Sequence, residues 1–150
     1  MSEYRTFVVP YDFSDHARAA LDTAVDLAGR LGAEIHLVHV IQAPLYAYPP
    51  FEGAGAAAVV NVAEIRDGVM KSLREIAEGL GGEVQVKIHV AEGGTVDGKI
   101  REMATELGAD LILMGTHGRT GIAHAFLGSV TERTLRRSPC PVLTVQAKEQ

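Results

Sequence analysis

The stretch DLILMGTHGRTGIAHAFLGSVT, residues 110–131, decides the fold class of this chain. It begins with a short apolar run that is typical of a buried strand, and glycines follow at Gly115 and Gly118. Gly128 and Ser129 then open a pattern that is typical of a helix. A strand, a glycine-containing loop and a helix N-terminus can together present backbone N–H groups and a positive helix dipole to a phosphate. The stretch therefore predicts a nucleotide-binding α/β protein.

Strand and helix patterns alternate along the rest of the chain. Ser14 and Gly32 are typical caps for the first helix. Because strands that alternate with helices are joined by right-handed crossovers, the pattern predicts a Rossmann-like α/β fold, a five-stranded parallel sheet with helices on both faces. The predicted strands are residues 6–9, 35–41, 84–90, 111–114 and 141–145, and the predicted helices are 17–31, 62–80, 96–107 and one that begins near 128.

We expect the strand order 3-2-1-4-5, with strands numbered along the chain. Strands 1, 4 and 5 are nearly continuous apolar runs, which is typical of buried strands, whereas the alternating strand 84–90 suits an edge. Strand 5 is too apolar for a free edge, which predicts that a second subunit pairs with Val142–Val145. In this order the topological switch point lies between the strands that lead to Asp12 and Gly115, and open α/β sheets bind ligands at that point.

Length, charge and cysteine content limit the classes of protein to which this chain can belong. The 150 residues suit one domain, residues 1–150, and the net charge of −5 gives no overall electrostatic case for nucleic acid. No apolar run reaches the roughly 18 residues of a membrane helix. The N-terminus lacks the features of a signal peptide, and one cysteine cannot form an internal disulfide. These observations predict a cytoplasmic protein without a membrane span.

Three further motifs accompany the glycine spacing Gly-x2-Gly-x9-Gly-Ser of residues 115–129. They are PYDFS at 10–14, the pair His39-Val40, and SPCPV at 138–142. Together, over the whole length, they resemble the ATP-binding branch of the universal stress proteins. The resemblance implies ATP as ligand, with Mg²⁺, a homodimer formed through the last strand, and a role in sensing or signalling to a protein partner that the sequence does not identify.

The resemblance also implies a set of nucleotide contacts. Asp12 and the backbone of Val40 would contact the adenosine, and Met114 and Gly115 would lie along the ribose. Pro10 belongs to the same set, because it begins the PYDFS motif. The implied phosphate contacts are Gly118, Arg119, Gly128, Ser129, Val130 and Thr131.

The chemistry of these residue types agrees with the implied contacts. Glycines let a backbone approach phosphates without a Cβ atom, and the hydroxyls of Ser129 and Thr131 can donate hydrogen bonds. Arg119 supplies a cation whose charge-assisted bond is worth about 1.5–3 kcal/mol. Asp12 can accept from a ribose hydroxyl or an adenine amine. The alternative is that the glycines only shape a tight loop and that Asp12 only initiates a helix.

Other motifs point to different chemistry more weakly. Residues 93–99 match a Walker A loop, but Ile100 replaces the hydroxyl residue that would hold Mg²⁺ and continues a helical apolar stripe, with Thr95 as the cap. His117 with Asp12 and Ser129 could be taken for a hydrolase triad, yet no Gly-x-Ser-x-Gly elbow is present. We therefore expect neither a Walker loop nor catalytic residues, and no side-chain motif predicts a metal site.

Three features of the sequence leave room for other interpretations. The aperiodic segment 42–58 is either a plain surface loop or a segment that docks a partner or gates the site. Tyr11 is bulkier than the small residue that is common beside the strand-1 aspartate of the family, and Gly93-Gly94-Thr95 replaces a common Gly-x-Pro turn. We expect an ATP-dependent regulatory switch with at most slow ATP hydrolysis. The alternatives are an adenylating or nucleotide-hydrolysing enzyme of related fold, and an interaction module that binds no nucleotide.

Overall fold

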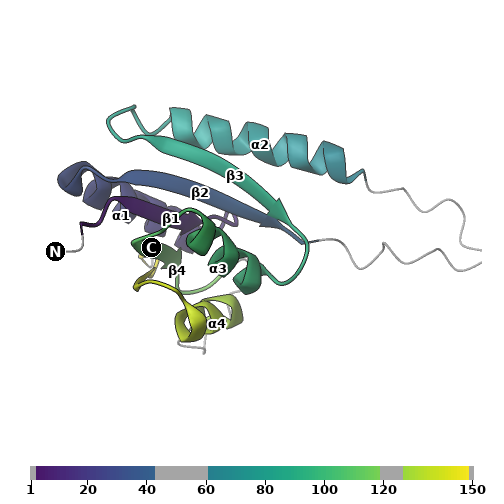
Figure 1. Cartoon of the computed structure of the whole chain (residues 1–150). Helices are drawn as coiled ribbons and strands as arrows, with labels where there is room; N and C mark the ends of the chain where they lie inside the picture. Colours follow the sequence, from purple (N-terminus) through teal and green to yellow (C-terminus); the bar gives the residue numbers. More distant parts are fainter. Residues whose placement is uncertain (1–2, 43–60, 119–126, 149–150) are drawn as a thin grey trace, which may run out of the picture.

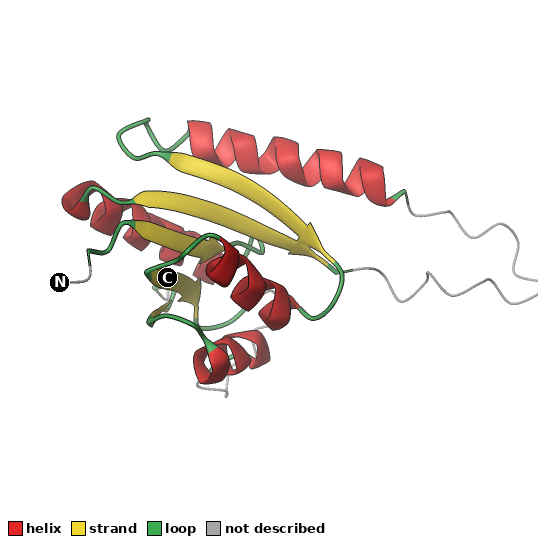
Figure 2. Ribbon diagram, in the orientation of Figure 1, coloured by secondary structure: helices red, strands yellow, loops and turns green. Residues whose placement is uncertain are grey.

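A five-stranded parallel sheet forms the centre of the computed structural model, which describes residues 3–42, 61–118 and 127–148. The strand order is β3-β2-β1-β4-β5, so the predicted α/β fold and strand order are confirmed (Figure 1). Strands and helices alternate along the chain, as Figure 2 shows. The elements are β1 (Thr6–Pro10), α1 (Asp15–Leu31), β2 (Glu34–Ile41), α2 (Val62–Glu78), β3 (Val86–Glu92), α3 (Val96–Glu106), β4 (Leu111–Gly115), α4 (Ser129–Arg137) and β5 (Val142–Val145).

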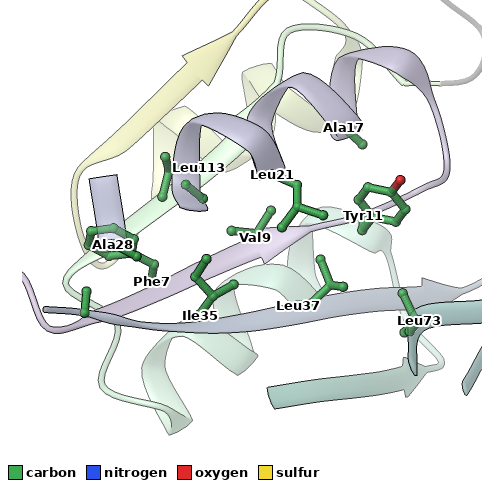
Figure 3. Close-up of a cluster of buried hydrophobic side chains, with 12 residues drawn as sticks. Phe7, Val9, Tyr11, Ala17, Leu21, Ala28, Ile35, Leu37, Leu73 and Leu113 are labelled. Carbon is green, nitrogen blue, oxygen red and sulfur yellow. The ribbon is translucent and has the colours of Figure 1, made fainter. Parts of the chain in front are cut away.

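The helices cover the two faces of the sheet as two layers. Phe7 of β1 points to one face, where it belongs to a buried cluster with Leu21 of α1 and Leu73 of α2 (Figure 3). Val8 points to the opposite face and is buried in a cluster with Ile100 of α3. Successive side chains of a strand point to opposite faces, so a continuously apolar β1 supplies both clusters.

Local capping begins and ends α1 where the sequence predicts it. Ser14 Oγ accepts a hydrogen bond from the N–H of Ala17 at 3.1 Å at the start of α1. Gly32 follows the helix in the left-handed region, with φ of 68°, where a side chain would be strained. Both predicted caps of the first helix are therefore confirmed.

The Walker-like residues 93–99 do not form a phosphate loop. Thr95 Oγ1 accepts the N–H of Gly98 at 3.2 Å and caps α3, so that Gly98 and Lys99 lie inside the helix. Ile100 is 1% exposed in the core. The apolar stripe of this helix therefore outweighs the match to the Walker pattern, as expected.

The start of β3 differs from the prediction by two residues. The sequence predicts a strand from residue 84, but β3 begins at Val86. Its first register pair is with Ile35, near the start of β2, and the N–H of Ile35 donates to the carbonyl of Gln85 at 2.8 Å. The strand therefore begins where its neighbour can pair with it, although the alternating pattern starts earlier.

None of the described helices is both long and apolar enough to cross a lipid bilayer. Residues 43–58 of the predicted excursion lie outside the described part of the chain, as does Arg119.

Candidate functional site

A cavity of about 890 Å³ opens at the carboxyl ends of the strands, where β1 and β4 lie side by side. This is the switch point that the strand order predicts. A second cavity, of about 480 Å³, lies at the amino ends of the strands near Arg5 and Gly32. All predicted site residues that the structure describes line the first cavity; they are Pro10, Asp12, Val40, Met114, Gly115, Gly118, Gly128, Ser129, Val130 and Thr131.

Asp12 follows β1, where it accepts a hydrogen bond within the protein and also lines the cavity. Its Oδ1 accepts the N–H of Ser14, the residue that caps α1, at 3.0 Å. Phe13, between these two residues, has φ of +65°, a left-handed conformation that costs a non-glycine residue about 1–2 kcal/mol. Asp12 therefore helps to start α1, as the alternative interpretation expects. The same turn leaves its carboxylate at the wall of the cavity.

The backbone of Val40 faces the gap beyond the end of β1. The last register pair between β1 and β2 is Pro10 with Val38, and the N–H of Tyr11 donates to the carbonyl of Val38 at 2.7 Å. Backbone groups of alternate strand residues point to the same side, so Val40 directs its N–H and C=O toward the β1 side as well. Val40 also lines the cavity, so both backbone groups lie at its wall.

Gly115 and Gly118 allow close contacts within the protein. A Cβ atom on Gly115 would lie 2.7 Å from His16 Cβ and 2.8 Å from the backbone C of His16. A Cβ atom on Gly118 would lie 2.7 Å from Asp12 Oδ2. These glycines therefore do shape a tight loop, and whether they also approach phosphates stays a prediction.

Helix α4 begins at the cavity with its first turn open. Gly128 precedes the helix, supplies no side-chain cap, and donates its N–H to the carbonyl of Thr116 at 2.7 Å. Ser129 is exposed and Val130 half-buried at the cavity wall. The first backbone N–H groups of a helix have no partner within the helix and carry its positive dipole end, so this turn can bind an anion.

Thr131 corrects one prediction from the sequence. Its hydroxyl donates to the carbonyl of Gly115 at 2.8 Å, and the residue is 3% exposed. The hydroxyl proton is therefore used within the protein and is not available for a phosphate. The side chain ties the first turn of α4 to the end of β4, and only its backbone N–H is a candidate ligand contact.

An aromatic group beside the cavity was not predicted from the sequence. His39 Nδ1 donates to the carbonyl of Tyr11 at 2.6 Å, and the rings of Tyr11 and His39 each lie 5.2 Å from that of Phe13. Burial raises the pKa of the Tyr11 hydroxyl above its ordinary 10.0, against the opposing effect of Arg18. The bulk of Tyr11 is thus accommodated in the α1 side of the core, where it is 7% exposed.

The side chains around the cavity offer few ligands for a metal ion. His117 lines the cavity, and its Nδ1 lies 3.1 Å from Thr116 Oγ1. The carboxylates of the described cavity wall are those of Asp12 and Glu132. Glu132 forms an ion pair with Arg136 at 2.7 Å. Within residues 3–42, 61–118 and 127–148, no group of three His, Cys, Asp or Glu side chains is arranged to hold a metal.

The strand order and the helices on both faces define an open, doubly wound α/β protein with a cavity at its switch point. The family model described as the universal stress protein family matches residues 3–146. The chain belongs to the universal stress protein family.

Individual relatives agree with this assignment. A universal stress protein of Methanocaldococcus jannaschii is 34% identical over 144 residues, which cover 95% of this chain and 82% of that protein. The structure of the universal stress protein UspA from Lactobacillus plantarum superposes with a TM-score of 0.79 at 23% identity, over 97% of this chain and 99% of that one. A universal stress protein solved in complex with cAMP has a TM-score of 0.67 at 27% identity, over 98% and 100% of the chains.

Proposed function

We propose that this chain binds ATP in the switch-point cavity and acts as a nucleotide-dependent regulatory switch of the cytoplasm. The observation that carries the proposal is the convergence of the described site residues on one cavity, together with the open first turn of α4. A relative of the same fold binds the adenine nucleotide cAMP, which supports a ligand of this class.

The cavity suggests how ATP would lie in it. The adenosine would contact Asp12 and the backbone of Val40, and the ribose would lie along Met114 and Gly115. The phosphates would then meet Gly118 and the first turn of α4. Arg119 would add a cation there, although it lies outside the described residues.

Mg²⁺ would enter this site with the nucleotide. The ion prefers oxygen ligands, keeps several waters, and is usually bound through one or two carboxylates together with substrate phosphates. Asp12 and Glu132 are the carboxylates of the described cavity wall. The donor set suits an ion carried by the phosphates and does not suit a cage built from the protein alone.

We also propose a homodimer formed through β5. This strand, Val142–Val145, pairs with β4 on one side and ends the sheet on the other. Its Leu143 is 38% exposed, and an apolar strand at a sheet edge is a template for pairing with another chain. A second copy would cover this edge, and the nucleotide would change what the dimer presents to a protein partner.

The proposed activity is binding with at most slow hydrolysis. Both carboxylates of the described cavity wall already have partners in the protein: Asp12 accepts the N–H of Ser14, and Glu132 pairs with Arg136. We therefore expect turnover below about 1 s⁻¹, under the ordinary range of enzymes. Faster release of phosphate, or release of pyrophosphate that depends on a second substrate, would favour the enzyme alternatives.

Thermal melts with and without ATP and Mg²⁺ test the proposal. At about 100 times its dissociation constant, ATP stabilises the folded state by about 2.7 kcal/mol, which corresponds to a Tm rise of about 5–10 °C. Ser129→Asp places a negative charge in the first turn of α4, which suits the helix but repels phosphates, so this rise should nearly vanish. Gln85→Glu adds the same charge at the amino ends of the strands, by the second cavity, and should keep the rise. A wild type without any rise would contradict nucleotide binding.

A further inference from the structure

Hydrogen bonds join the glycine loop of residues 115–118 to the end of β5. The N–H of Thr116 donates to the carbonyl of Val145, the last residue of β5, at 3.0 Å. Two residues further along, the N–H of Ala147 donates to His16 Nδ1, also at 3.0 Å. The loop at the cavity and the strand at the sheet edge therefore meet at the first turn of α1.

His16 lies at the centre of this junction. Because its Nδ1 accepts the N–H of Ala147, the ring proton is on Nε2. Thr116 Oγ1 lies 3.5 Å from this Nδ1 and 3.1 Å from Nδ1 of His117. The rings of His16 and His117 are 5.4 Å apart, and His117 lines the cavity. One side chain of α1 thus contacts both the continuation of β5 and a residue next to the ligand site.

The contacts of residues 115–118 with His16 leave no space into which this loop could move. Gly115 packs so closely on His16 that even a Cβ atom would overlap its side chain and backbone. The N–H of Gly128 donates to the carbonyl of Thr116 at 2.7 Å, which fixes the other side of the loop to the start of α4. Close-packed contacts of this kind transmit displacements between elements because they do not deform continuously.

We propose that His16 couples occupancy of the nucleotide site to self-association through β5. The inference rests on the proposed function, which supplies the nucleotide and the second copy. A nucleotide that orders residues 116–118 also orders Val145 and Ala147, and so prepares the strand edge for its partner. By thermodynamic linkage, the dimer then binds the nucleotide more tightly by the same factor. His16 acts as a positioning residue, because it lies outside both the cavity wall and the strand.

Sedimentation equilibrium of the full chain, with and without saturating ATP and Mg²⁺, measures this coupling. For the wild type we expect ATP to lower the dimer dissociation constant about fivefold or more. The His16→Ala variant should still bind ATP and still dimerise, but its dimer dissociation constant should no longer depend on ATP. His16→Asn restores an acceptor near the position of Nδ1 and should recover the dependence. Asp26→Ala, which removes an exposed ion pair with Arg30 on the same helix, is the control and should behave like the wild type.

The outcomes separate this inference from the proposed function. A wild type that binds ATP and dimerises, but with a dissociation constant independent of ATP, overturns the coupling alone. A His16→Ala variant that keeps the wild-type dependence does the same. A wild type that fails to bind ATP or to dimerise overturns both. If His16→Ala does not fold, Thr116→Val keeps the backbone N–H, removes the hydroxyl, and must reduce the dependence for the inference to stand.

Discussion

Gly118 lies against Asp12 so closely that a Cβ atom on the glycine would come within 2.7 Å of Asp12 Oδ2. The other carboxylate oxygen, Oδ1, accepts the N–H of Ser14 at 3.0 Å. The loops that follow β1 and β4 therefore meet at one carboxylate. The position of this carboxylate in the cavity therefore depends on a glycine more than a hundred residues away along the chain.

Gly118→Ala should displace the carboxylate of Asp12. Gly118 is exposed and its close neighbour is a side-chain oxygen, so the loss of stability should be about 1 kcal/mol or less, the low end for overpacking, in urea denaturation. ATP affinity should fall as well. Gly68→Ala is the matched control, because a Cβ atom there meets nothing within 4 Å on α2. That control should gain up to about 1 kcal/mol from helix propensity. A Gly118→Ala variant with wild-type stability and affinity would show that the contact is not rigid.

Gly115→Ala should destabilise the protein more than Gly118→Ala does. Its Cβ atom would meet the backbone C of His16 at 2.8 Å, and backbone cannot rotate away as a carboxylate can. We expect a loss of about 3 kcal/mol or more in the same urea experiment. The reverse ranking of the two variants would contradict the close packing of α1 on the end of β4.

Thr131 and Ser129 should separate structure from binding, although both carry hydroxyls in the first turn of α4. Thr131→Val leaves the buried carbonyl of Gly115 without its donor, so stability should fall by about 1–3 kcal/mol while each folded molecule still binds ATP. Ser129→Ala should leave stability nearly unchanged and weaken ATP binding by about 0.5–1.5 kcal/mol. Calorimetric titration and urea melts of both variants check this, and equal effects on both properties would contradict the assignment.

The imidazole of His89 should make the stability of the protein depend on pH. His36 Nδ1 lies 2.8 Å from His89 Nε2, with Glu34 and Lys87 as charged neighbours. Burial, followed by the charges of His36 and Lys87, lowers the pKa of His89 below its ordinary 6.5. The folded protein then binds fewer protons than the unfolded chain. Its stability is therefore complete above about pH 6.5 and falls as the pH drops through the lower folded value.

Melts at about pH 7.5 and about pH 5.5 measure this dependence. The wild type should melt at a lower temperature in acid, and His89→Gln, which cannot titrate, should show a smaller difference between the two conditions. An unchanged difference in the variant would assign the pH dependence to other groups.

Periodicity and capping residues predict most of the fold because they act locally. Helical stripes locate α1, α2 and α3, Gly128 and Ser129 indicate the start of α4, and runs of apolar residues locate the strands. Ser14 and Gly32 mark the ends of α1. The start of β3 could not be predicted in this way, since it depends on where Ile35 of β2 offers a partner. The left-handed conformation of Phe13 has no signal in the sequence either, because a bulky side chain disfavours it.

The candidate site was predicted from glycine spacing and topology, but the roles of its residues were predicted less well. The sequence places Gly115 and Thr131 at the site without indicating that Gly115 packs on His16 or that Thr131 donates to the carbonyl of Gly115. These contacts join segments that are distant along the chain, and no local pattern encodes them. They show that some of the predicted site residues maintain the shape of the site. The ligand contacts of the remaining site residues stay a prediction.

The most direct test of nucleotide binding in the switch-point cavity is a two-dimensional amide NMR titration of the ¹⁵N-labelled chain with ATP and Mg²⁺. We predict that the largest shifts occur at the backbone amides of Val40, Gly118 and Val130, which line the cavity from three different elements. Shifts confined to the second cavity around Arg5 and Gly32, or no shifts at all, would contradict the account.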